Sequence, residues 1–386
     1  MKENTEKMKI FYNPEPFVSG ESGIPVYAKN LIKNLLSLDP AIQLFSGAKT
    51  INPQFYYRIK TSLGQNDDFH FHIRCRFYPS FWKAPPLLSR FLDFREDDYD
   101  VIHMLGNYIA PSCWFSSFEK LILTIHDVYL FHPDIIQNDP VPHKDYILKV
   151  QKDDAHRAKK IITDSEFSKR DIHKFLDVPV DKIQVIPIAT QWVDDSKVPV
   201  DKSFFDEYSI EPGKFFLSVG AIKRNKNYET LLDGFEKYRS SKEYRNEKLV
   251  IVGPAFNLTL GETIRHFSDV ILLENVSSES LKMLYQNAKG FFLLSLIEGF
   301  GIPLLEAMQQ GTPSCYARGT ATDEIGRDAA FSIEDPKDSD AVAEMFGRFS
   351  AGGQEITASV EECRKIASEY NWQNTARKTL ELYRSI

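Results

Sequence analysis

Short runs of apolar residues alternate along the chain with longer segments in which apolar residues recur every three or four positions. Runs of the first kind are typical of buried strands, and segments of the second kind are typical of amphipathic helices. In the first half, the predicted strands are KIFYNP, VIHML, KLILTIHD, KIITDS and IQVIPI, and the predicted helices are PVYAKNLIKNLLSL and HKDYILKVQKDDAHRAK. This alternation predicts an α/β domain with a parallel sheet.

The pattern breaks after Ile186 and then starts again. Segment 187–203 is rich in Pro, Asp and Ser and has no clear period, so we predict a linker there. Beyond it, the predicted strands are KFFLSVGAI, KLVIVGP, VILLENV and GFFLLSL, and the predicted helices are YETLLDGFEKYRSS, SSESLKMLYQNA, IPLLEAMQQ and NWQNTARKTLELYRSI. We therefore expect two α/β domains of similar build. Ligands of open α/β sheets bind beyond the carboxyl ends of the strands, so the expected site is the cleft between the domains.

The length of 386 residues exceeds what one hydrophobic core usually supports, in agreement with two domains. The formal net charge of −7 argues against a general nucleic-acid binder, which needs a basic surface. The four cysteines lie far apart and include no CxxC pair, which excludes a zinc site visible in the sequence and favours a reducing cytosol.

Membrane segments are not predicted. The first residues carry no apolar core of signal-peptide length, and no run of about 18 apolar residues occurs in the sequence. We expect a cytoplasmic protein, and attachment to the inner face of a membrane is compatible with that expectation.

The segment SLIEGFGIPLLEAMQQGTP, residues 295–313, contains the most informative pattern. Pro303 suits the first turn of a helix and Gly311 suits the position just past its end, so a helix is predicted from Pro303 to Gln310. Gly299 and Gly301 allow the backbone to approach a ligand closely. A helix start with free N–H groups favours anions, so the turn is a candidate phosphate cradle.

A glutamate stands on each side of this cradle, Glu298 before it and Glu306 one turn inside the helix. Carboxylates repel phosphate but are strong acceptors for sugar hydroxyls. A nucleotide sugar has the corresponding layout of sugar, diphosphate and ribose. The alternative is that both glutamates are solvated residues around a strand–helix turn.

The segment EGFGIPLLEAMQQGTP closely resembles the Glu-x7-Glu signature of the retaining glycosyltransferases called group 1 or family four, which have the GT-B fold. GESGIPVYAKNLIKNL is similar to the N-terminal glycine loop and first helix of that family. Further similar segments follow in the family's order: KLILTIHDVYLFHP, AKKIITDSEFSKRDI, KIQVIPIAT, FFLSVGAIKRNKNYETLLDGF and YNWQNTARKTLELY.

The resemblance implies an α/β protein of the GT-B fold, with two Rossmann-like parallel-sheet domains that face each other across a cleft. Residues 1–190 would form the acceptor-binding domain and residues 191–370 the domain that binds the nucleotide sugar. Residues 371–386 would form a C-terminal helix that packs back on the N-terminal domain.

The resemblance also implies roles for single residues. Glu298 would lie by the donor sugar as a catalytic residue, Glu306 would bind the ribose, and Lys226 would neutralise the diphosphate. The backbone that would face the sugar and diphosphate belongs to Gly299, Phe300, Gly301, Ile302, Pro303 and Leu304.

The sequence departs from the family at two basic positions. Many members have arginine where this chain has Ala221 and Asn225. Lys223 and Arg224 are near enough in sequence to supply replacement charge for the diphosphate.

His126, in TIHD, stands at the end of a predicted strand, and by resemblance it contacts the donor sugar as a catalytic residue. The alternative is a core histidine bonded to the backbone. Gly23 would bring backbone close to the diphosphate; its segment lacks the GxGxxG spacing, which argues against a dinucleotide oxidoreductase. The turn that ends at Val276 is a candidate for nucleobase contacts.

Several other polar residues are interpreted as structural. His103 in VIHML is expected to be a core residue, and His132 a loop residue. Ser165 either caps a helix or serves the acceptor side. The DYD of residues 98–100 has the form found in metal-dependent transferases of another fold, but it directly precedes a strand and is interpreted as its solvated lead-in. We expect neither a metal nor a cofactor.

The acceptor side is less defined. The segment from Phe77 to Arg95 mixes aromatic, leucine and basic residues, which suits peripheral membrane contact or a lipid-linked sugar. A buried helix after a Pro-rich turn gives the same pattern.

The sequence thus predicts a retaining, metal-independent transferase that moves a hexosyl group from a nucleoside diphosphate sugar to a glycan or lipid-linked acceptor in surface polysaccharide assembly. HDVYLFHP and EGFGIPLLEAM resemble mannosyl- and rhamnosyltransferases, so GDP-mannose is the first donor expected. The alternatives are an inactive glycosyltransferase-like binding subunit and a GT-B sugar-nucleotide epimerase.

Overall fold

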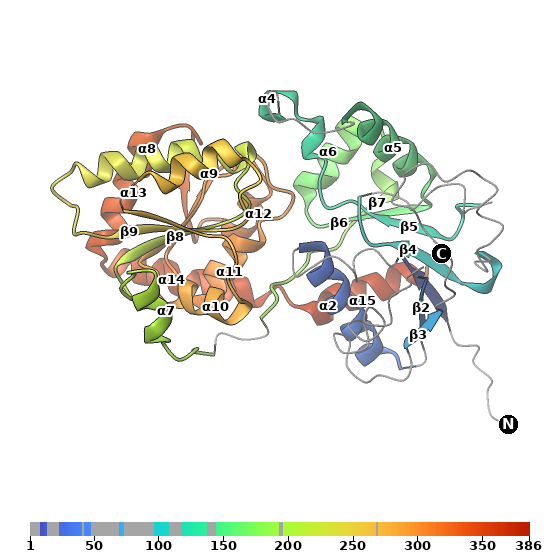
Figure 1. The fold of residues 1–386 in the computed structure, drawn as a ribbon. Coiled ribbons are helices and arrows are strands. Elements are labelled where there is room, and N and C mark those ends of the chain that lie inside the picture. The colour runs from blue at the N-terminus through green and yellow to red at the C-terminus, as the bar shows by residue number, and fades with distance from the viewer. Residues whose placement is uncertain are drawn as a thin grey trace. The chain divides into compact units, whose positions relative to one another are not determined.

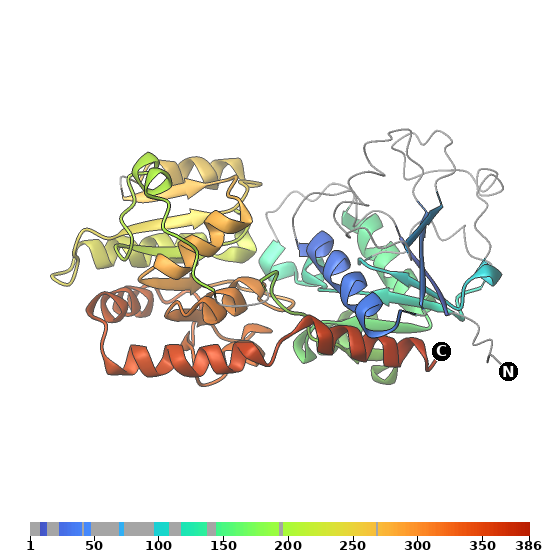
Figure 2. The same ribbon diagram turned by 90° about the horizontal axis from the view of Figure 1, so that it is seen from below.

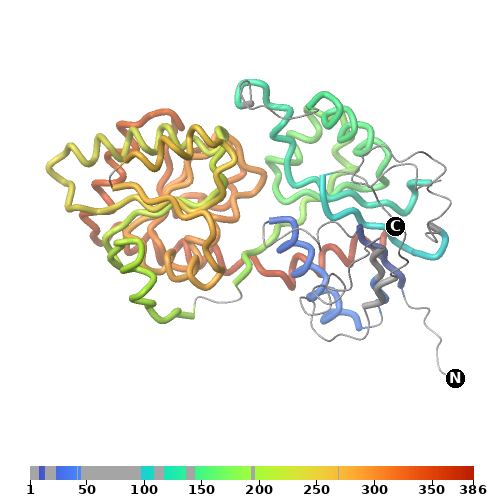
Figure 3. The backbone as a smooth tube through the Cα atoms, viewed as in Figure 1, coloured from blue at the N-terminus to red at the C-terminus, as the bar shows by residue number. Residues whose placement is uncertain are grey.

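The structure is a computed structural model that describes residues 8–13, 23–40, 42–47, 69–72, 96–107, 117–136, 144–192, 196–267 and 269–386; Figure 3 traces the chain through them. The chain divides into two compact units. Unit 1 comprises Met1–Phe131, Val141–Gln191 and Asn371–Ile386, and unit 2 comprises His132–Pro140 and Trp192–Tyr370.

Unit 1 is built on a parallel sheet of seven strands in the order β3-β2-β1-β4-β5-β6-β7 (Figure 1). The strands are β1 (Lys9–Tyr12), β2 (Gln43–Gly47), β3 (Phe69–His72), β4 (Val101–Met104), β5 (Leu121–Thr124), β6 (Lys160–Thr163) and β7 (Ile183–Val185). Its helices are α2 (Gly23–Leu38), α5 (Lys144–Arg157), α6 (Glu166–Leu176) and α15 (Trp372–Tyr383), with short 3₁₀ turns at Glu96–Asp98, Tyr129–Phe131 and Val180–Lys182.

The two faces of this sheet pack against different helices, and successive residues of each strand point to opposite faces. On one face, Ile102 and Leu123 join an apolar core with Ala155 of α5 and Ile172 of α6. The opposite face is covered by α2 and α15, which lie side by side in Figure 2.

The last helix belongs to unit 1 through buried polar contacts. The indole N–H of Trp372 donates to the carbonyl of Thr190 at 2.7 Å, and the hydroxyl of Thr375 donates to the carbonyl of Pro187 at 2.7 Å. At the other end of α15, the hydroxyl of Tyr383 contacts Nδ1 of His103 at 2.6 Å. A C-terminal helix that returns to the first sheet was expected.

Unit 2 is built on a parallel sheet of six strands in the order β10-β9-β8-β11-β12-β13. The strands are β8 (Phe215–Val219), β9 (Lys248–Val252), β10 (Val270–Leu273), β11 (Gly290–Leu293), β12 (Ser314–Ala317) and β13 (Phe331–Ile333). The helices are α4 (Pro133–Ile136), α7 (Lys202–Glu207), α8 (Tyr228–Arg239), α9 (Leu258–Arg265), α10 (Ser278–Asn287), α11 (Ile302–Gln310), α12 (Thr322–Gly326), α13 (Ser339–Ala351) and α14 (Gln354–Ser368), and a 3₁₀ turn, η6, spans Arg224–Lys226.

Helices cover both faces of this second sheet, as Figure 1 shows for α8, α9 and α13 on one side and α10, α11 and α14 on the other. An aromatic cluster fills the first side: the ring centroid of Phe346 lies 4.7 Å from that of Phe216 and 4.1 Å from that of Phe292. Gly234 lets α8 approach α13, since a Cβ there would lie 2.4 Å from Cγ1 of Val342. Two parallel sheets with helices on both faces confirm the predicted α/β class.

No helix within the described ranges is long and apolar enough to cross a membrane. The segment from Phe77 to Arg95, predicted as a membrane or acceptor contact, lies outside the described residues.

Candidate active site

The loop between β11 and α11 has the backbone that its glycines predict. Gly301 is the N-cap of α11 with φ 104°, and Gly311 is its C-cap with φ 77°; both are left-handed conformations that favour glycine. A Cβ on Gly301 would also lie 2.9 Å from Cγ2 of Thr322. The helix begins at Ile302, one residue before the predicted start, and ends at Gln310 as predicted.

The backbone of this loop is held in place by its own side chains. The ring of Phe300 is buried and packs edge-on against Tyr370, with ring centroids 5.8 Å apart. Leu304 is fully buried, whereas Ile302 and Pro303 are half-buried. The amino end of α11 thus lies in a fixed loop, where its dipole favours an anion.

Glu298 precedes this helix and lies in a polar cluster. Its Oε1 accepts a hydrogen bond from the hydroxyl of Ser295 at 2.6 Å and forms an ion pair with Nζ of Lys226. The side chains of Lys226 and Glu298 are 16% and 12% exposed. Lys226 and Glu298, to which the family resemblance assigns the diphosphate and the donor sugar, are therefore in direct contact.

Lys226 and Glu298 come together because β8 and β11 are neighbouring strands of the sheet. Lys226 ends η6, which follows β8, and the amide of Leu296, which follows β11, donates to the carbonyl of Asn225 at 2.8 Å. Asn227 has a left-handed backbone with φ 57°. Its side-chain Nδ2 donates to the carbonyls of Leu294 at 3.1 Å and Pro336 at 2.5 Å. Asn227 is thus a positioning residue that the sequence analysis missed.

The other basic residues predicted for the diphosphate follow β8 as well. Nζ of Lys223 lies 5.0 Å from the ring centroid of Phe256, a strongly exposed aromatic side chain in the loop after β9. Arg224 begins η6. Asn225, which stands where many family members have arginine, has a buried Oδ1 for which the described residues provide no hydrogen-bond partner.

Glu306 lies deeper than Glu298, since it is 5% exposed. The hydroxyl of Tyr285, from α10, donates to its Oε2 at 3.1 Å. Burial raises the pKa of Tyr285 well above its usual value, and the charge of Glu306 raises it further, so Tyr285 remains a neutral donor. Val276, the nucleobase candidate, is half-buried between β10 and α10.

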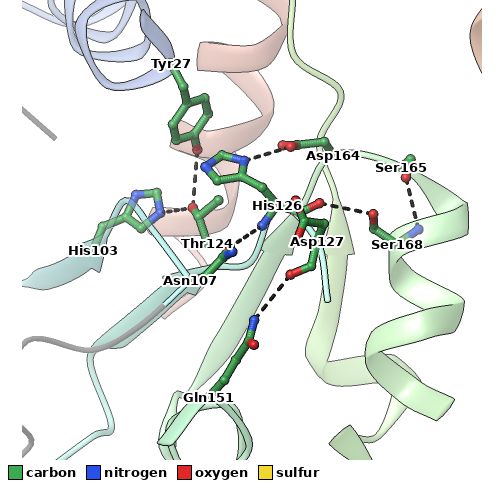
Figure 4. A network of polar contacts seen from close by, with 10 residues as sticks. All are labelled: Tyr27, His103, Asn107, Thr124, His126, Asp127, Gln151, Asp164, Ser165 and Ser168. Carbon is green, nitrogen blue, oxygen red and sulfur yellow. Dashed lines mark hydrogen bonds and ion pairs between the residues drawn. The ribbon is translucent and has the colours of Figure 1, made fainter. Parts of the chain in front are cut away.

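His126 belongs to unit 1, where it follows β5 at the carboxyl edge of the sheet (Figure 4). Its Nδ1 lies 2.7 Å from Oδ2 of Asp164, which follows β6. Its backbone amide donates to Oδ1 of Asn107 at 2.9 Å, and its carbonyl accepts from the hydroxyl of Ser168 at 3.1 Å. Three loops, after β4, β5 and β6, therefore converge on one histidine.

The ring of His126 has different surroundings at its second nitrogen. The ring of Tyr27 packs edge-on against the imidazole, with centroids 5.0 Å apart at 85°. Nε2 is buried and has no hydrogen-bond partner among the described residues. Burial lowers the pKa of His126, but the charge and hydrogen bond of Asp164 and the charge of Asp127 outweigh it, so the pKa lies above the usual value.

His103 differs from His126 although it lies on the neighbouring strand. It is fully buried, with Nδ1 2.6 Å from the hydroxyl of Tyr383 and Nε2 2.7 Å from Oγ1 of Thr124. Burial and, to a smaller extent, the charge of His126 lower the pKa of His103 to about 3. His103 is therefore a neutral core residue, as the sequence analysis expected.

The other predicted residues have simpler surroundings. Gly23 is the first residue of α2, and nothing described lies within 4 Å of where a Cβ would be. Ser165 caps α6, with its side chain accepting from the amide of Ser168 at 3.0 Å. Oδ2 of Asp100 accepts from the amide of Lys9 at 2.7 Å, which gives it a structural role beside β4. His132 precedes the short helix α4.

Two family models match the chain. Residues 200–367 match the model described as "Glycosyl transferases group 1", and residues 22–189 match the model described as "Glycosyltransferase Family 4". The chain belongs to this family of glycosyltransferases. The resemblance noted in the sequence is thereby confirmed.

Individual relatives agree with this assignment. The chain is 25% identical to the O-antigen chain mannosyltransferase B of Escherichia coli over 98% of this chain and 100% of that protein. It is 24% identical to the MMP alpha-(1->4)-mannosyltransferase of Mycolicibacterium hassiacum, over 76% of this chain and 72% of that protein. In structure it is similar to Anabaena HepE, solved in complex with UDP-glucose, with a TM-score of 0.71, 17% identity and coverage of 98% of this chain and 100% of that chain. The fold is GT-B, as predicted.

Proposed function

We propose that the protein transfers a hexosyl group with retention of configuration from a nucleoside diphosphate sugar, GDP-mannose first, to a glycan or lipid-linked acceptor in surface polysaccharide synthesis. The observation that carries the proposal is the contact between Lys226 and Glu298 in front of the amino end of α11. It combines a cation and a helix dipole, which suit a diphosphate, with a carboxylate, which suits sugar hydroxyls. The mannosyltransferase relatives support the choice of sugar.

The donor would bind along the carboxyl edge of the second sheet. Lys226 would contact the β-phosphate, Glu298 the hydroxyls of the sugar, and Glu306 the ribose. Lys223 and Arg224 would add charge in place of the two arginines that the chain lacks at Ala221 and Asn225. Backbone groups from Gly299 to Leu304 and from Gly23 would approach the diphosphate, and the turn at Val276 would contact the base.

The reaction would be a displacement on one face of the sugar. The oxygen of the acceptor hydroxyl forms a bond with the anomeric carbon while the bond to the β-phosphate oxygen breaks, and the departing phosphate takes the acceptor's proton. Lys226 and the start of α11 stabilise the charge that develops on the phosphate. The proposal assigns His126 to the same reaction, as a hydrogen-bond partner of a sugar hydroxyl.

A double displacement through a carboxylate is not proposed. Retaining glycosidases use two carboxylates about 5 Å apart, one of which attacks the sugar. Here one glutamate of the pair is assigned to the ribose, which leaves Glu298 without a partner acid. Catalysis would then rest on positioning and electrostatics, without a metal ion, and transfer should persist in excess EDTA.

A binding subunit without catalysis is the second candidate. The observation that favours it is the replacement of two family arginines by Ala221 and Asn225, the second of which has a buried carbonyl oxygen without a partner among the described residues. Binding of a sugar nucleotide with no turnover on any acceptor would support this alternative.

The third candidate, a GT-B sugar-nucleotide epimerase, is separated by product analysis without acceptor, because an epimerase needs no second substrate.

The donor class is tested by thermal shifts with GDP, UDP, ADP and dTDP. We expect one nucleotide, GDP first, to raise the melting temperature of the wild type, and Lys226→Gln to reduce that rise. Lys237→Gln serves as the control, since Lys237 forms an exposed ion pair with Asp340. If no nucleotide shifts the wild type, the donor site as proposed is wrong.

The acceptor and the place of action are also part of the proposal. The acceptor would be bound by unit 1, and the protein would work in the cytoplasm at the inner face of the membrane. The segment from Phe77 to Arg95 remains a prediction for membrane contact. Cosedimentation with anionic vesicles, repeated with the basic residues of that segment changed to glutamine, tests it.

A further inference from the structure

Asp164 is buried at the carboxyl edge of the first sheet, where an ionised carboxylate is costly. The residue is 2% exposed, and its Oδ2 lies 2.7 Å from Nδ1 of His126 (Figure 4). A buried carboxylate is tolerated when it is paired, because desolvation otherwise outweighs what the charge contributes. The other oxygen, Oδ1, has no hydrogen-bond partner among the described residues. His126 is therefore the partner that offsets the cost of burying the Asp164 carboxylate.

The imidazole of His126 is constrained from several directions at once. Asn107 binds its backbone amide, Ser168 binds its carbonyl, and Tyr27 packs on the ring. Of the two ring nitrogens, Nδ1 is taken by Asp164, and Nε2 is the one without a partner in the described part of the chain. These contacts hold the ring and engage, among the described residues, only one of its two nitrogens.

We propose that Asp164 is a positioning residue of the transferase: its carboxylate keeps a proton on Nδ1 of His126 and aims Nε2 at a hydroxyl of the bound sugar. A carboxylate accepts a hydrogen bond and donates none, so Nδ1 must be the donor of this pair. The second nitrogen then carries a proton only when the ring is cationic. This inference rests on the proposed function for the identity of the hydroxyl, but the arrangement of the pair does not depend on it.

The charged and titratable groups around the ring favour the cation. Asp164 and Asp127 carry negative charge from the loops after β6 and β5. His103, from β4, is kept neutral by burial, because its pKa is lowered to about 3. Tyr27, from α2, stays neutral because burial raises its pKa far above the usual value. The pKa of His126 is raised above its ordinary value, which is the direction that favours a cationic ring able to donate from Nε2.

The substitution Asp164→Asn tests the proposal, since it keeps the size of the side chain and removes its charge. Thr163→Val is the matched control: Thr163 is the preceding residue of β6, is fully buried, and has a hydroxyl without a partner among the described residues. The protein is labelled with ¹³C,¹⁵N-histidine, and the signals of His126 are assigned by their absence in His126→Gln. The ring is then titrated by NMR in each variant.

In the wild type and Thr163→Val, we expect His126 to titrate above its ordinary value and to keep the proton on Nδ1 in the neutral form. In Asp164→Asn, its pKa should fall by about 1 to 3 units. If the titration and the tautomer of His126 are the same in Asp164→Asn as in the wild type, the proposal is wrong, whatever the activity.

Transfer kinetics give the second readout. We expect Asp164→Asn to lower kcat/KM about ten- to hundredfold, the loss typical of partners that orient a functional histidine, and to move the alkaline limb of the pH profile to lower pH, because the ring must stay protonated to donate from Nε2. In the His126→Gln background, Asp164→Asn should lower kcat/KM only slightly, because Asp164 acts through the histidine. Equal losses in both backgrounds would overturn the positioning role.

The two proposals fail in different ways. A changed NMR titration with unchanged kcat/KM would leave the arrangement of the pair intact and contradict the contact of Nε2 with the sugar. Should Asp164→Asn not fold, Asn107→Ala loosens the backbone of His126 from a partly exposed position and keeps the carboxylate; it should lower kcat/KM with the pKa of His126 still raised. A normal kcat/KM in that variant would contradict the need for a fixed ring.

Discussion

Lys226 and Glu298 form an ion pair although 72 positions separate them in the sequence. Lys226 follows β8 and Glu298 follows β11, and these strands are neighbours in the sheet of unit 2. Because both side chains are mostly buried, loss of either leaves the other with an uncompensated charge in a poorly solvated place. Loss of a single partner is therefore expected to destabilise the edge at which we propose that the donor binds.

Single substitutions of this pair should destabilise unit 2. We expect Lys226→Gln and Glu298→Gln each to lower the free energy of unfolding by about 1–3 kcal/mol, and the double variant to lose clearly less than the sum. Urea denaturation with a double-mutant cycle measures this. The exposed pair of Lys237 and Asp340 is the control, in which the same changes should have little effect. Additive losses at Lys226 and Glu298 would show that the ion pair is not coupled in solution.

Glu306 should discriminate between nucleotides by their ribose. Glu306→Gln keeps an acceptor for the hydroxyl of Tyr285, so the variant should fold, but a charged acceptor for the ribose is lost. We expect GDP binding to weaken about tenfold, in line with a charged hydrogen bond worth about 1.5–3 kcal/mol. Calorimetry with GDP and 2′,3′-dideoxy-GDP measures this. A loss of the same size for the dideoxy nucleotide would contradict contact with the ribose hydroxyls.

The ion pair of His126 and Asp164 should make stability depend on pH. The folded-state pKa of His126 is raised, so its contribution is fully present below the unfolded-state value of about 6.5 and is lost as the pH rises through the folded-state value. The difference in unfolding free energy between the wild type and Asp164→Asn should therefore be larger at about pH 6 than at about pH 9. Chemical denaturation at both pH values checks this. A difference that grows with pH would contradict the sign.

Tyr383 should couple the C-terminal helix to the first sheet. Its hydroxyl lies 2.6 Å from Nδ1 of His103 and 3.1 Å from the hydroxyl of Tyr12, and all three residues are buried. Tyr383→Phe leaves both partners without this contact, so we expect a loss of about 1–3 kcal/mol in the free energy of unfolding. Tyr146→Phe, on an exposed position of α5, is the control and should stay within about 0.5 kcal/mol. Equal effects of the two changes would contradict the network.

The sequence predicts best those features that depend on neighbouring residues. Gly301 and Gly311 bound α11 because left-handed backbone favours glycine, and Ser165 caps α6 because a short hydroxyl side chain reaches the free amides of a helix start. Buried strands such as β5 and β9 are visible as apolar runs, since both of their faces are covered. These features follow from local stereochemistry and burial.

What the sequence analysis missed depends on pairing between distant segments. β2 and β3 were not predicted, because the short sequences QLFSG and FHFH become strands through their registers with β1 and with each other. Asp164 was overlooked although it stands near the end of the predicted strand KIITDS, as His126 does in KLILTIHD. Its importance comes from the adjacency of β5 and β6, which the sequence alone does not give. A search for polar residues at the carboxyl end of each predicted strand would have found it.

The most direct test of the account is the release of nucleoside diphosphate from GDP-mannose in the presence of candidate glycan and lipid-linked acceptors, measured for the wild type, Glu298→Gln and Lys226→Gln. We predict turnover by the wild type and a loss of at least about a hundredfold in both variants. Lys226→Gln removes charge stabilisation of the leaving group, which contributes about 2.7–4 kcal/mol, and Glu298→Gln removes the charged acceptor that positions the sugar. Undiminished turnover in Glu298→Gln and Lys226→Gln would contradict the site that we propose.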